Sequence, residues 1–403
     1  MRLALIIDDY LPNSTRVGAK MFHELACELQ DYGHNVTVIT PNWEQKNKIS
    51  YYTLDGVSIW SFKSGKTKGV NKITRAINES LLSFKAWFAI KDNISCNTFD
   101  AVIYYSPSIF FGPLVHRIKE CCNCKAYLVL RDLFPQWVID AGLISKYSVV
   151  TKYFQIFERY SYKQADTIGF MSKRNIDVYL KHSKEKLPCN LEVLRNWARL
   201  HPEKNTHHYR KLLNLDDKII FFYGGNIGHA QDMSNLMRLA KNMQSFKNAH
   251  FLFIGQGDEV DLINSLAKKW NLCNFTYLPS VSQKIFKMIL SEVDIGLFSL
   301  SKNHSAHNFP GKLLGYMVQS LPILGSVNKD NDLLPVINQS RSGFIHINGD
   351  DGDLLQSAIK LYSDKNLRLS YGKNAFELLR KDFDVKSATN SILTSLGIQN
   401  ENN

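Results

Sequence analysis

Short apolar runs alternate with amphipathic stretches along the first half of the chain. Leu3–Ile7 predicts a buried strand that ends at Asp8. From Val17 to Leu29, apolar residues recur about every four positions, which predicts a helix that stops at Gly33. Val36–Thr40 predicts the next strand, and the order strand–helix–strand is typical of a parallel α/β sheet. Further strands are predicted at Ala101–Tyr105, Ala126–Leu130, Thr167–Met171 and Leu191–Leu194, with a helix around Phe110–Glu120.

The same alternation begins again after a polar stretch. Asn196 to Asn205 shows no periodicity and contains Pro202, which predicts a linker. After it, Lys218–Tyr223 predicts a strand, Gly224–Gly228 a glycine loop and Gln231–Met243 a helix. The remaining predicted elements are strands at His250–Gly255, Asn274–Leu278, Asp294–Ser299, Pro322–Gly325 and Gly343–Ile345, and a long helical stretch over Leu354–Leu379.

Two alternating halves of similar size predict an α/β protein with two Rossmann-like domains that face each other across a cleft. We expect the N-terminal domain to cover residues 1–198 and the C-terminal domain residues 199–379. In such sheets ligands bind beyond the carboxyl ends of the strands, so functional residues are expected in the loops that follow them.

Composition narrows the class of protein. The 403 residues are 44% hydrophobic and 12% aromatic, which excludes a largely disordered chain. No apolar run approaches the roughly 18 residues needed to span a bilayer. Asp8 and Asp9 break the opening apolar run, which does not fit a signal peptide. We therefore expect a protein of the cytoplasm.

Charge and cysteine content bear on the partners. The net charge of +12 favours nucleotide phosphates, nucleic acid or an anionic membrane surface. The cluster of Cys121, Cys122 and Cys124 has no second cysteine pair nearby that would complete a tetrahedral zinc site. We expect a surface turn there, and no metal.

Residues 60–91 combine basic and aromatic side chains. They contain seven Lys or Arg and one acid, Glu79, interleaved with Trp60, Phe62 and other apolar residues. One predicted helical face carries Ile73, Ile77, Leu81, Phe84 and Phe88. Two hypotheses remain open: a peripheral contact with a membrane surface, or a crossover helix that buries its apolar face on the sheet.

Two glycine-rich turns follow predicted strands of the C-terminal half, at Gly224–Gly228 and Gly255–Asp258. Glycine lets backbone N–H groups approach a phosphate, and a following helix N-terminus adds partial positive charge. Neither turn matches the P-loop or the dinucleotide motif, so a tight strand–helix turn remains the alternative. Two such turns at one sheet edge favour a nucleotide site in this half.

Residues 304–312 form the densest polar stretch near a strand end. Lys312 opens the predicted helix Leu313–Val318, and Pro310 and Gly311 shape its start. Lys312 and the first amides of that helix can hold a diphosphate. Exposed loop histidines and a solvated lysine are the alternative.

Charged residues also follow buried strands of the N-terminal half. Arg131 and Asp132 come directly after Ala126–Leu130, where a buried charged pair is costly unless it is paired or functional. Arg16 and Gly18 lie at the start of the first helix, where they can contact an acceptor phosphate.

Five segments in this order resemble retaining, GT-B-fold nucleotide-sugar glycosyltransferases of family GT4 over nearly the whole chain. They are YGHNVTVITP with the helix before it, VLRDLFPQW, FFYGGNIGHAQDM, FLFIGQGDE and HNFPGKLLGYMVQSLPILGS. Within the family, the chain most resembles bacterial O-antigen and capsule enzymes of the WbuB type, which transfer N-acetyl-L-fucosamine. The resemblance implies an acceptor-binding N-terminal domain and a C-terminal domain that binds a nucleotide sugar. It also implies that a last helix, about residues 380–403, packs back on the first domain.

The resemblance implies roles for individual residues. Two family glutamates correspond to His307 and Gly315, and the basic pair beside the diphosphate corresponds to Asn226 and Gln231, so Lys312 is the expected replacement. The expected catalytic residues are Asp132, Arg131, His307 and Lys312. The expected donor contacts are Gly225, Asn226, Gly228, Gln231, Gly255, Leu278, Asn308, Phe309, Gly311 and Gly315, and the expected acceptor contacts are Arg16 and Gly18.

The implied reaction moves N-acetyl-L-fucosamine or a related 6-deoxy-HexNAc, with retention, from a UDP-sugar to a polyprenyl-diphosphate-linked acceptor. It would serve O-antigen or capsule biosynthesis at the cytoplasmic face of the inner membrane, without metal or other cofactor. The alternatives are a two-Rossmann UDP-sugar epimerase that uses His307 and Asp132, a non-catalytic basic protein that binds membrane or nucleic acid, and an inactive scaffold that lacks both glutamates. Dispersed basic residues and the lack of a known module speak against nucleic acid.

Overall fold

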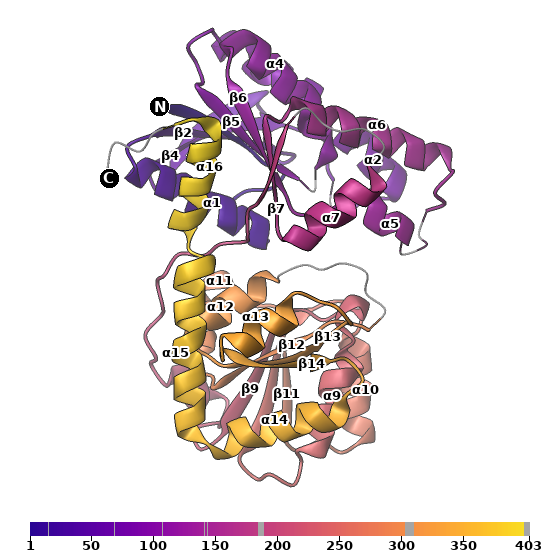
Figure 1. Ribbon diagram of the computed structural model, residues 1–403, viewed down its shortest axis with the longest axis vertical. Coiled ribbons are helices and arrows are strands. Elements are labelled where there is room, and N and C mark those ends of the chain that lie inside the picture. Colours follow the sequence, from indigo (N-terminus) through magenta and orange to yellow (C-terminus); the bar gives the residue numbers. More distant parts are fainter. Residues whose placement is uncertain are drawn as a thin grey trace. The chain divides into compact units, whose positions relative to one another are not determined.

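The computed structural model describes residues 1–14, 16–67, 69–106, 108–140, 142, 144–183, 189–302 and 310–398. The chain forms two compact units. The N-terminal unit comprises Met1–Asn196 and the segment that begins at Val385, and the C-terminal unit comprises Trp197–Asp384. Figure 1 shows both units, with most of their helices and strands labelled. Within the described ranges, every helix is too short or too polar to cross a membrane.

The N-terminal unit is built on an eight-stranded sheet. Its strands are β1 (Arg2–Ile6), β2 (Asn35–Asn42), β3 (Ile49–Leu54), β4 (Val57–Lys63), β5 (Ala101–Ser106), β6 (Lys125–Leu130), β7 (Thr167–Phe170) and β8 (Asn190–Val193). Their order is β3-β4-β2-β1-β5-β6-β7-β8, and only the β3–β4 pairing is antiparallel. Asp55 and Gly56 join β3 to β4 with φ values of 49° and 85°, as a two-residue hairpin turn requires.

Helices cover both faces of this sheet. They are α1 (Val17–Asp31), α2 (Lys72–Ser80), α3 (Leu82–Ile90), α4 (Gly112–Cys122), α5 (Gln136–Asp140), α6 (Val149–Gln164), α7 (Lys173–His182) and α16 (Val385–Leu396). One core cluster joins α3 and α4 to the strands through residues such as Ala86, Leu114 and Leu128. Strand side chains alternate, so Leu3 and Leu5 face the opposite side, where α1 and α16 contact each other.

The C-terminal unit carries a second, six-stranded sheet in which every pairing is parallel. Its strands are β9 (Ile219–Asn226), β10 (Ala249–Gln256), β11 (Phe275–Pro279), β12 (Ile295–Ser299), β13 (Ile323–Val327) and β14 (Gly343–Ile347), in the order β11-β10-β9-β12-β13-β14. Its helices are α8 (His208–Leu212), α9 (Met233–Asn242), α10 (Val260–Lys269), α11 (Gln283–Leu290), α12 (Gly311–Val318), α13 (Leu333–Gln339), α14 (Asp351–Ser363) and α15 (Lys365–Asp382).

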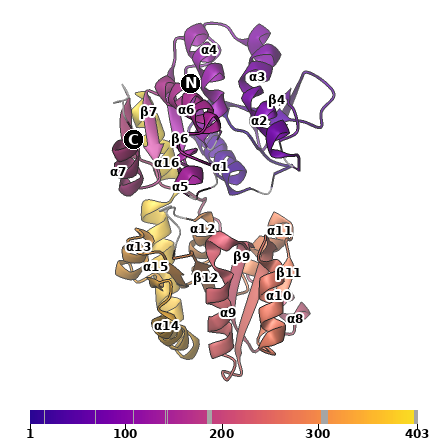
Figure 2. The same cartoon turned by 90° about the vertical axis from the view of Figure 1, so that its right-hand side faces the viewer.

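Helices cover both faces of the second sheet (Figure 2), and an apolar cluster lies on each face. One contains Leu236 and Met237 of α9, Ile263 of α10 and Ala358 of α14. The other contains residues of α11, α12, α13 and α15, among them Leu313. Each unit is thus a parallel or mainly parallel sheet between two helical layers, which confirms the predicted α/β class with two Rossmann-like domains.

The predicted linker Asn196–Asn205 is confirmed, since it contains no helix or strand and the division between the two units falls within it. Its Trp197 and Ala198 are buried, and the Ala198 N–H donates to the Phe383 carbonyl oxygen (3.0 Å). Two predicted helix boundaries were wrong. The helix predicted from Gln231 begins at Met233, after a 3₁₀ turn over His229–Gln231. The stretch over Leu354–Leu379 is two helices, because Asp364 is extended and accepts a capping bond from the Leu367 N–H.

Two further expectations about the N-terminal unit need correction. Trp60 and Phe62 of the basic, aromatic segment lie in β4, within a hairpin that the hydrophobic pattern did not reveal. Cys121 and Cys122 end α4 instead of forming a surface turn, and Cys122 is buried. Among the described residues, no three His, Cys, Asp or Glu side chains are grouped to hold a metal ion.

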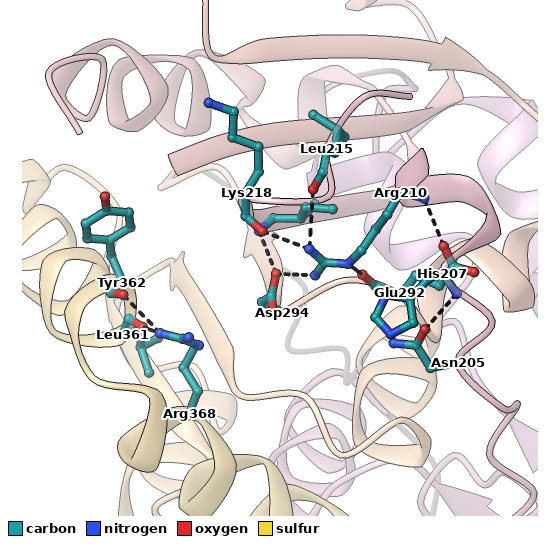
Figure 3. A network of polar contacts seen from close by, with 11 residues as sticks. Asn205, His207, Arg210, Leu215, Lys218, Glu292, Asp294, Leu361, Tyr362 and Arg368 are labelled. Atoms are coloured by element: carbon teal, nitrogen blue, oxygen red, sulfur yellow. Dashed lines mark hydrogen bonds and ion pairs between the residues drawn. The ribbon is translucent and has the colours of Figure 1, made fainter. Parts of the chain in front are cut away.

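A buried polar network fixes the start of the C-terminal sheet (Figure 3). Arg210 donates to the Glu292 carbonyl oxygen (2.5 Å), to the Lys218 carbonyl oxygen (2.8 Å) and to the Asp294 carboxylate (2.5 Å). The Glu292 carboxylate accepts from three consecutive N–H groups at the start of α8 and from the Thr206 hydroxyl. Burial alone would raise the pKa of Glu292, but these hydrogen bonds outweigh it and hold the pKa below its usual value.

Candidate functional site

The strand order of the C-terminal unit reverses between β9 and β12. The sheet extends through β10 and β11 beyond β9, and through β13 and β14 beyond β12. Such a switch point is where ligands bind in open parallel sheets, beyond the carboxyl ends of the strands. Here β9 ends in Gly224, Gly225 and Asn226, and α12 is the next described helix after β12.

The two glycine-rich turns lie side by side at this edge. The strand register pairs Gly225 with Gly255 and Asn226 with Gln256. A Cβ atom at Gly255 would collide with the carbonyl oxygen of Gly225, so strand packing itself accounts for the glycine at 255. Gly225 has a φ of +120°, which favours glycine, and a Cβ atom there would lie 3.6 Å from the Lys312 Nζ.

Lys312 is the basic group beside Gly225, while the Asp258 carboxylate lies at the Gly228 end of the same turn. Lys312 lies in the first turn of α12, and its Nζ donates to the Tyr223 hydroxyl (2.6 Å) and sits 3.8 Å from the centre of the Tyr223 ring. The Tyr223 hydroxyl donates in turn to the Asn226 carbonyl oxygen (2.5 Å). Tyr223 is fully buried, so it holds the ammonium group in one place beside the glycine turn.

The charge environment of Lys312 favours the binding of an anion beside it. Burial lowers the pKa of Lys312 to about 7, and among the described residues no carboxylate forms an ion pair with it. A phosphate would supply the missing negative charge and raise that pKa again. The N–H groups in the first turn of α12, from Gly311 onward, add partial positive charge at the same end.

The other expected donor contacts lie around the β9 turn, along β11 or in α12. Asn226 donates through Nδ2 to the Gln231 Oε1 (2.7 Å), and a Cβ atom at Gly228 would lie 2.7 Å from that Nδ2. Leu278 is half-buried against the core in β11. Gly315 faces Leu290 across an otherwise open space. His307, Asn308 and Phe309 lie outside the described residues.

In the N-terminal unit, charged side chains follow β1 and β6 at the carboxyl ends of these strands. Arg131 is buried and donates to the Leu130 and Arg195 carbonyl oxygens (3.2 and 3.3 Å). Burial lowers the pKa of Arg131 to about 10, against the opposing effects of Tyr105, Tyr127 and Asp132. Burial raises the pKa of Tyr105; the charge of Arg131 opposes this shift, and the charge of Asp132 adds to it.

Arg16 and Gly18 join this group at the start of α1. Arg16 is half exposed, with its Nε 3.6 Å from the Asp9 carboxylate. A Cβ atom at Gly18 would lie 2.7 Å from the Tyr105 hydroxyl oxygen, so the glycine lets that ring pack against α1. Asp8 was not among the expected site residues, yet burial raises its pKa to about 6 against the opposing charge of Arg16. Its position directly after β1 was the signal that could have found it.

A small pocket beside α6 was also not predicted. Its lining includes Gln136, Gln155, Glu158 and Tyr162. Burial raises the pKa of Glu158 to about 7. The Tyr162 hydroxyl faces that carboxyl group but forms no hydrogen bond of normal geometry. A carboxyl group that titrates near neutrality beside an unsatisfied hydroxyl can bind a ligand hydroxyl or exchange a proton with it.

Comparison with known proteins shows which family and which relatives this chain resembles. Residues 199–378 match the family described as "Glycosyl transferases group 1". The Probable glycosyltransferase WbjE of Pseudomonas aeruginosa is 23% identical over 56% of this chain and 57% of its own length, so the match spans a little over half of that relative. The Putative colanic acid biosynthesis glycosyl transferase WcaI of Escherichia coli is 22% identical over 78% of this chain and 80% of its own length.

A solved structure supports the same fold. HepE of Anabaena, crystallised with UDP and glucose, superimposes with a TM-score of 0.70 at 10% identity and covers 98% of this chain and 99% of its own. At that identity the likeness shows the GT-B fold alone. Residues 199–378 thus match the glycosyl transferases group 1 family, and the chain is similar to bacterial proteins named as glycosyltransferases, one of them assigned to colanic acid biosynthesis.

Proposed function

We propose that the protein transfers a sugar from a UDP-sugar to a lipid-linked glycan acceptor with retention of configuration. The sugar is N-acetyl-L-fucosamine or a related 6-deoxy-HexNAc, and the reaction serves O-antigen or capsule synthesis at the cytoplasmic face of the inner membrane. The UDP bound to HepE and the name of WcaI support the donor and the process. The resemblance to N-acetyl-L-fucosamine transferases supports the sugar.

The observation that carries this proposal is the place of Lys312. A lysine with no carboxylate partner in the described part of the chain, held by Tyr223 beside the Gly225 turn, fits the diphosphate of a nucleotide sugar. In the proposed reaction the C1–O bond to the diphosphate breaks and its electron pair passes to the leaving phosphate oxygen. Lys312 and the start of α12 stabilise that developing charge. The acceptor oxygen bonds to C1 on the same face, and its proton passes to the leaving oxygen.

The N-terminal unit supplies the acceptor residues in this proposal. Arg131 and Arg16 attract the phosphates of the acceptor, and Asp132 orients its reacting hydroxyl. The raised pKa of Asp8 makes it a further group that can hold an acceptor hydroxyl.

A thermal-shift screen tests the donor directly. Purified protein is heated with UDP, GDP, dTDP, ADP or CMP at about 100 times the expected dissociation constant, where a ligand of the native state adds about 2.7 kcal/mol of stability. We expect stabilisation by UDP and little by the others. Stabilisation by GDP or ADP instead would replace the proposed donor. No shift with any nucleotide at millimolar concentration would favour an inactive scaffold.

We also propose that transfer needs no bound metal, because Lys312 and the α12 N-terminus supply the positive charge. Transfer rates should then stay within about twofold when millimolar EDTA is added, since no Lewis acid is removed. The control is the same assay with added Mg²⁺. A loss of activity with EDTA that Mg²⁺ restores would contradict this part of the proposal.

A further inference from the structure

The helices of the basic, aromatic segment leave an apolar stripe in solvent. Their buried side chains are on one side, with Leu82, Ala86 and Ile90 in the core. The other side is exposed: Ile73 is 75% exposed and Phe88 57%, and Ile77, Leu81 and Phe84 lie between them. The predicted apolar face is therefore not buried on the sheet, which removes the crossover-helix hypothesis for these five side chains. We name them the α2–α3 stripe.

Helix α6 presents a second exposed apolar stripe. Val149 is 82% exposed and Ile156 66%, and Tyr153 and Tyr160 continue the same i, i+4, i+7, i+11 spacing. We name these four residues the α6 stripe. The Ser80 hydroxyl, next to Leu81 of the first stripe, lies 2.5 Å from the Tyr153 hydroxyl of the second, so the end of α2 contacts the α6 stripe. Figure 2 labels α2, α3 and α6 in the same unit.

The charges around both stripes are mostly positive. The sequence from 72 to 91 carries four basic residues and one acid, Glu79, which pairs with Arg75 (2.8 Å). Helix α6 carries Lys152, Arg159 and Lys163 and one acid, Glu158, which lines the pocket described above. Exposed apolar residues in such number are rare on a soluble surface and mark an interaction site.

We infer that the α2–α3 and α6 stripes together form a docking surface for an anionic lipid bilayer. Apolar side chains enter the headgroup region while basic residues beside them attract anionic lipids, each contributing roughly 1 kcal/mol near the surface. This inference deepens the proposed function, because it names where the protein meets the membrane that holds its acceptor. It extends the expected contact from residues 60–91 to α6, and it excludes Trp60 and Phe62, which lie in β4.

Vesicle flotation of the full chain tests the surface without donor or acceptor. Vesicles of pure phosphatidylcholine are compared with vesicles that contain phosphatidylglycerol, at low and at high salt. We expect binding to the anionic vesicles, weakened by salt, and little binding to phosphatidylcholine alone. The triple variant I77S/F84S/F88S and the variant V149S/I156S should each reduce binding by about tenfold or more. K85E/K152E should abolish the preference for anionic lipid.

The matched control is Leu369→Ser on α15, where an equally exposed side chain (62%) belongs to neither stripe. It should leave vesicle binding unchanged. All variants should keep the UDP-induced thermal shift, which separates failure of this surface from failure of the donor proposal. Equal binding by wild type and stripe variants would overturn the inference. So would a wild type that binds no vesicle but forms a dimer that the stripe variants break.

Discussion

The Lys312→Met variant is expected to lower kcat/KM for sugar transfer by about 10²–10³-fold and to lose most of the stabilisation by UDP. Removal of one preorganised group from a developing oxyanion has an effect of this size in other enzymes. Methionine keeps the length of the side chain and can pack beside Tyr223, while the charge next to the Gly225 turn disappears. The measurements are steady-state kinetics and calorimetric titration with UDP.

The pH dependence of UDP binding provides an independent check on this lysine. In the free protein burial holds the pKa of Lys312 at about 7, below the usual 10.5, so above pH 7 the site is mostly neutral. Binding of an anion then requires proton uptake, and the affinity should fall by up to about tenfold per pH unit between pH 7.5 and 9.5. Lys312→Met should lack this slope.

The matched control is Lys247→Met, which removes an exposed lysine of the same unit just before β10, at the amino ends of the strands. It should change neither kinetics nor UDP affinity. The folded state of Lys312→Met should be at least as stable as the wild type, because a charge that burial disfavours has been removed. Wild-type UDP affinity in Lys312→Met would show that the diphosphate binds elsewhere.

The Arg210→Met variant is expected to destabilise the C-terminal unit by about 3–5 kcal/mol, since breaking a buried ionic cluster leaves its partners unpaired. The guanidinium is only 8% exposed and bonds the Glu292 and Lys218 carbonyl oxygens and the Asp294 carboxylate. Methionine satisfies none of them. Urea unfolding followed by circular dichroism, with the UDP-dependent transition assigned to the C-terminal unit, measures the loss.

Arg380→Met is the control for this effect. Arg380 pairs with Glu377 at 2.6 Å in the same unit, but both side chains are about half exposed or more. A surface pair of this kind contributes at most about 1 kcal/mol, so its loss should shift the transition little. If Arg210→Met is no more destabilising than Arg380→Met, the buried network does not stabilise the unit as we infer.

Most strands and helices could be predicted because their apolar periodicity depends on burial alone. The run Leu3–Ile7 and the helix from Val17 are buried by any α/β sheet, whatever lies beside them. The β3–β4 hairpin was missed because β3 is the edge strand of its sheet and none of its residues is buried, so the consecutive Tyr51 and Tyr52 are both exposed and β3 shows no alternation. Its local signal was the Asp55-Gly56 dipeptide.

The candidate site was predictable in part. The glycine turns and Lys312 could be proposed from their positions after strands, since parallel strands present their carboxyl ends at one edge. The role of Tyr223 could not be predicted, because a tyrosine in an apolar strand is expected to be a core residue. Its role depends on a contact with Lys312, which lies 89 residues later in the sequence. Glu158 and Tyr162 are ordinary residues of an amphipathic helix until α5 and α7 enclose them.

By itself the sequence determined the α/β class, the two halves, the glycine turns and the composition of residues 60–91, because these depend on local periodicity and residue chemistry. The tertiary structure alone decided which apolar faces are buried and which charges lack partners. The stripe of α2 and α3 could have been core, and Lys312 could have been solvated. Packing against other elements left the α2–α3 stripe exposed and lowered the pKa of Lys312. No local sequence pattern encodes either result.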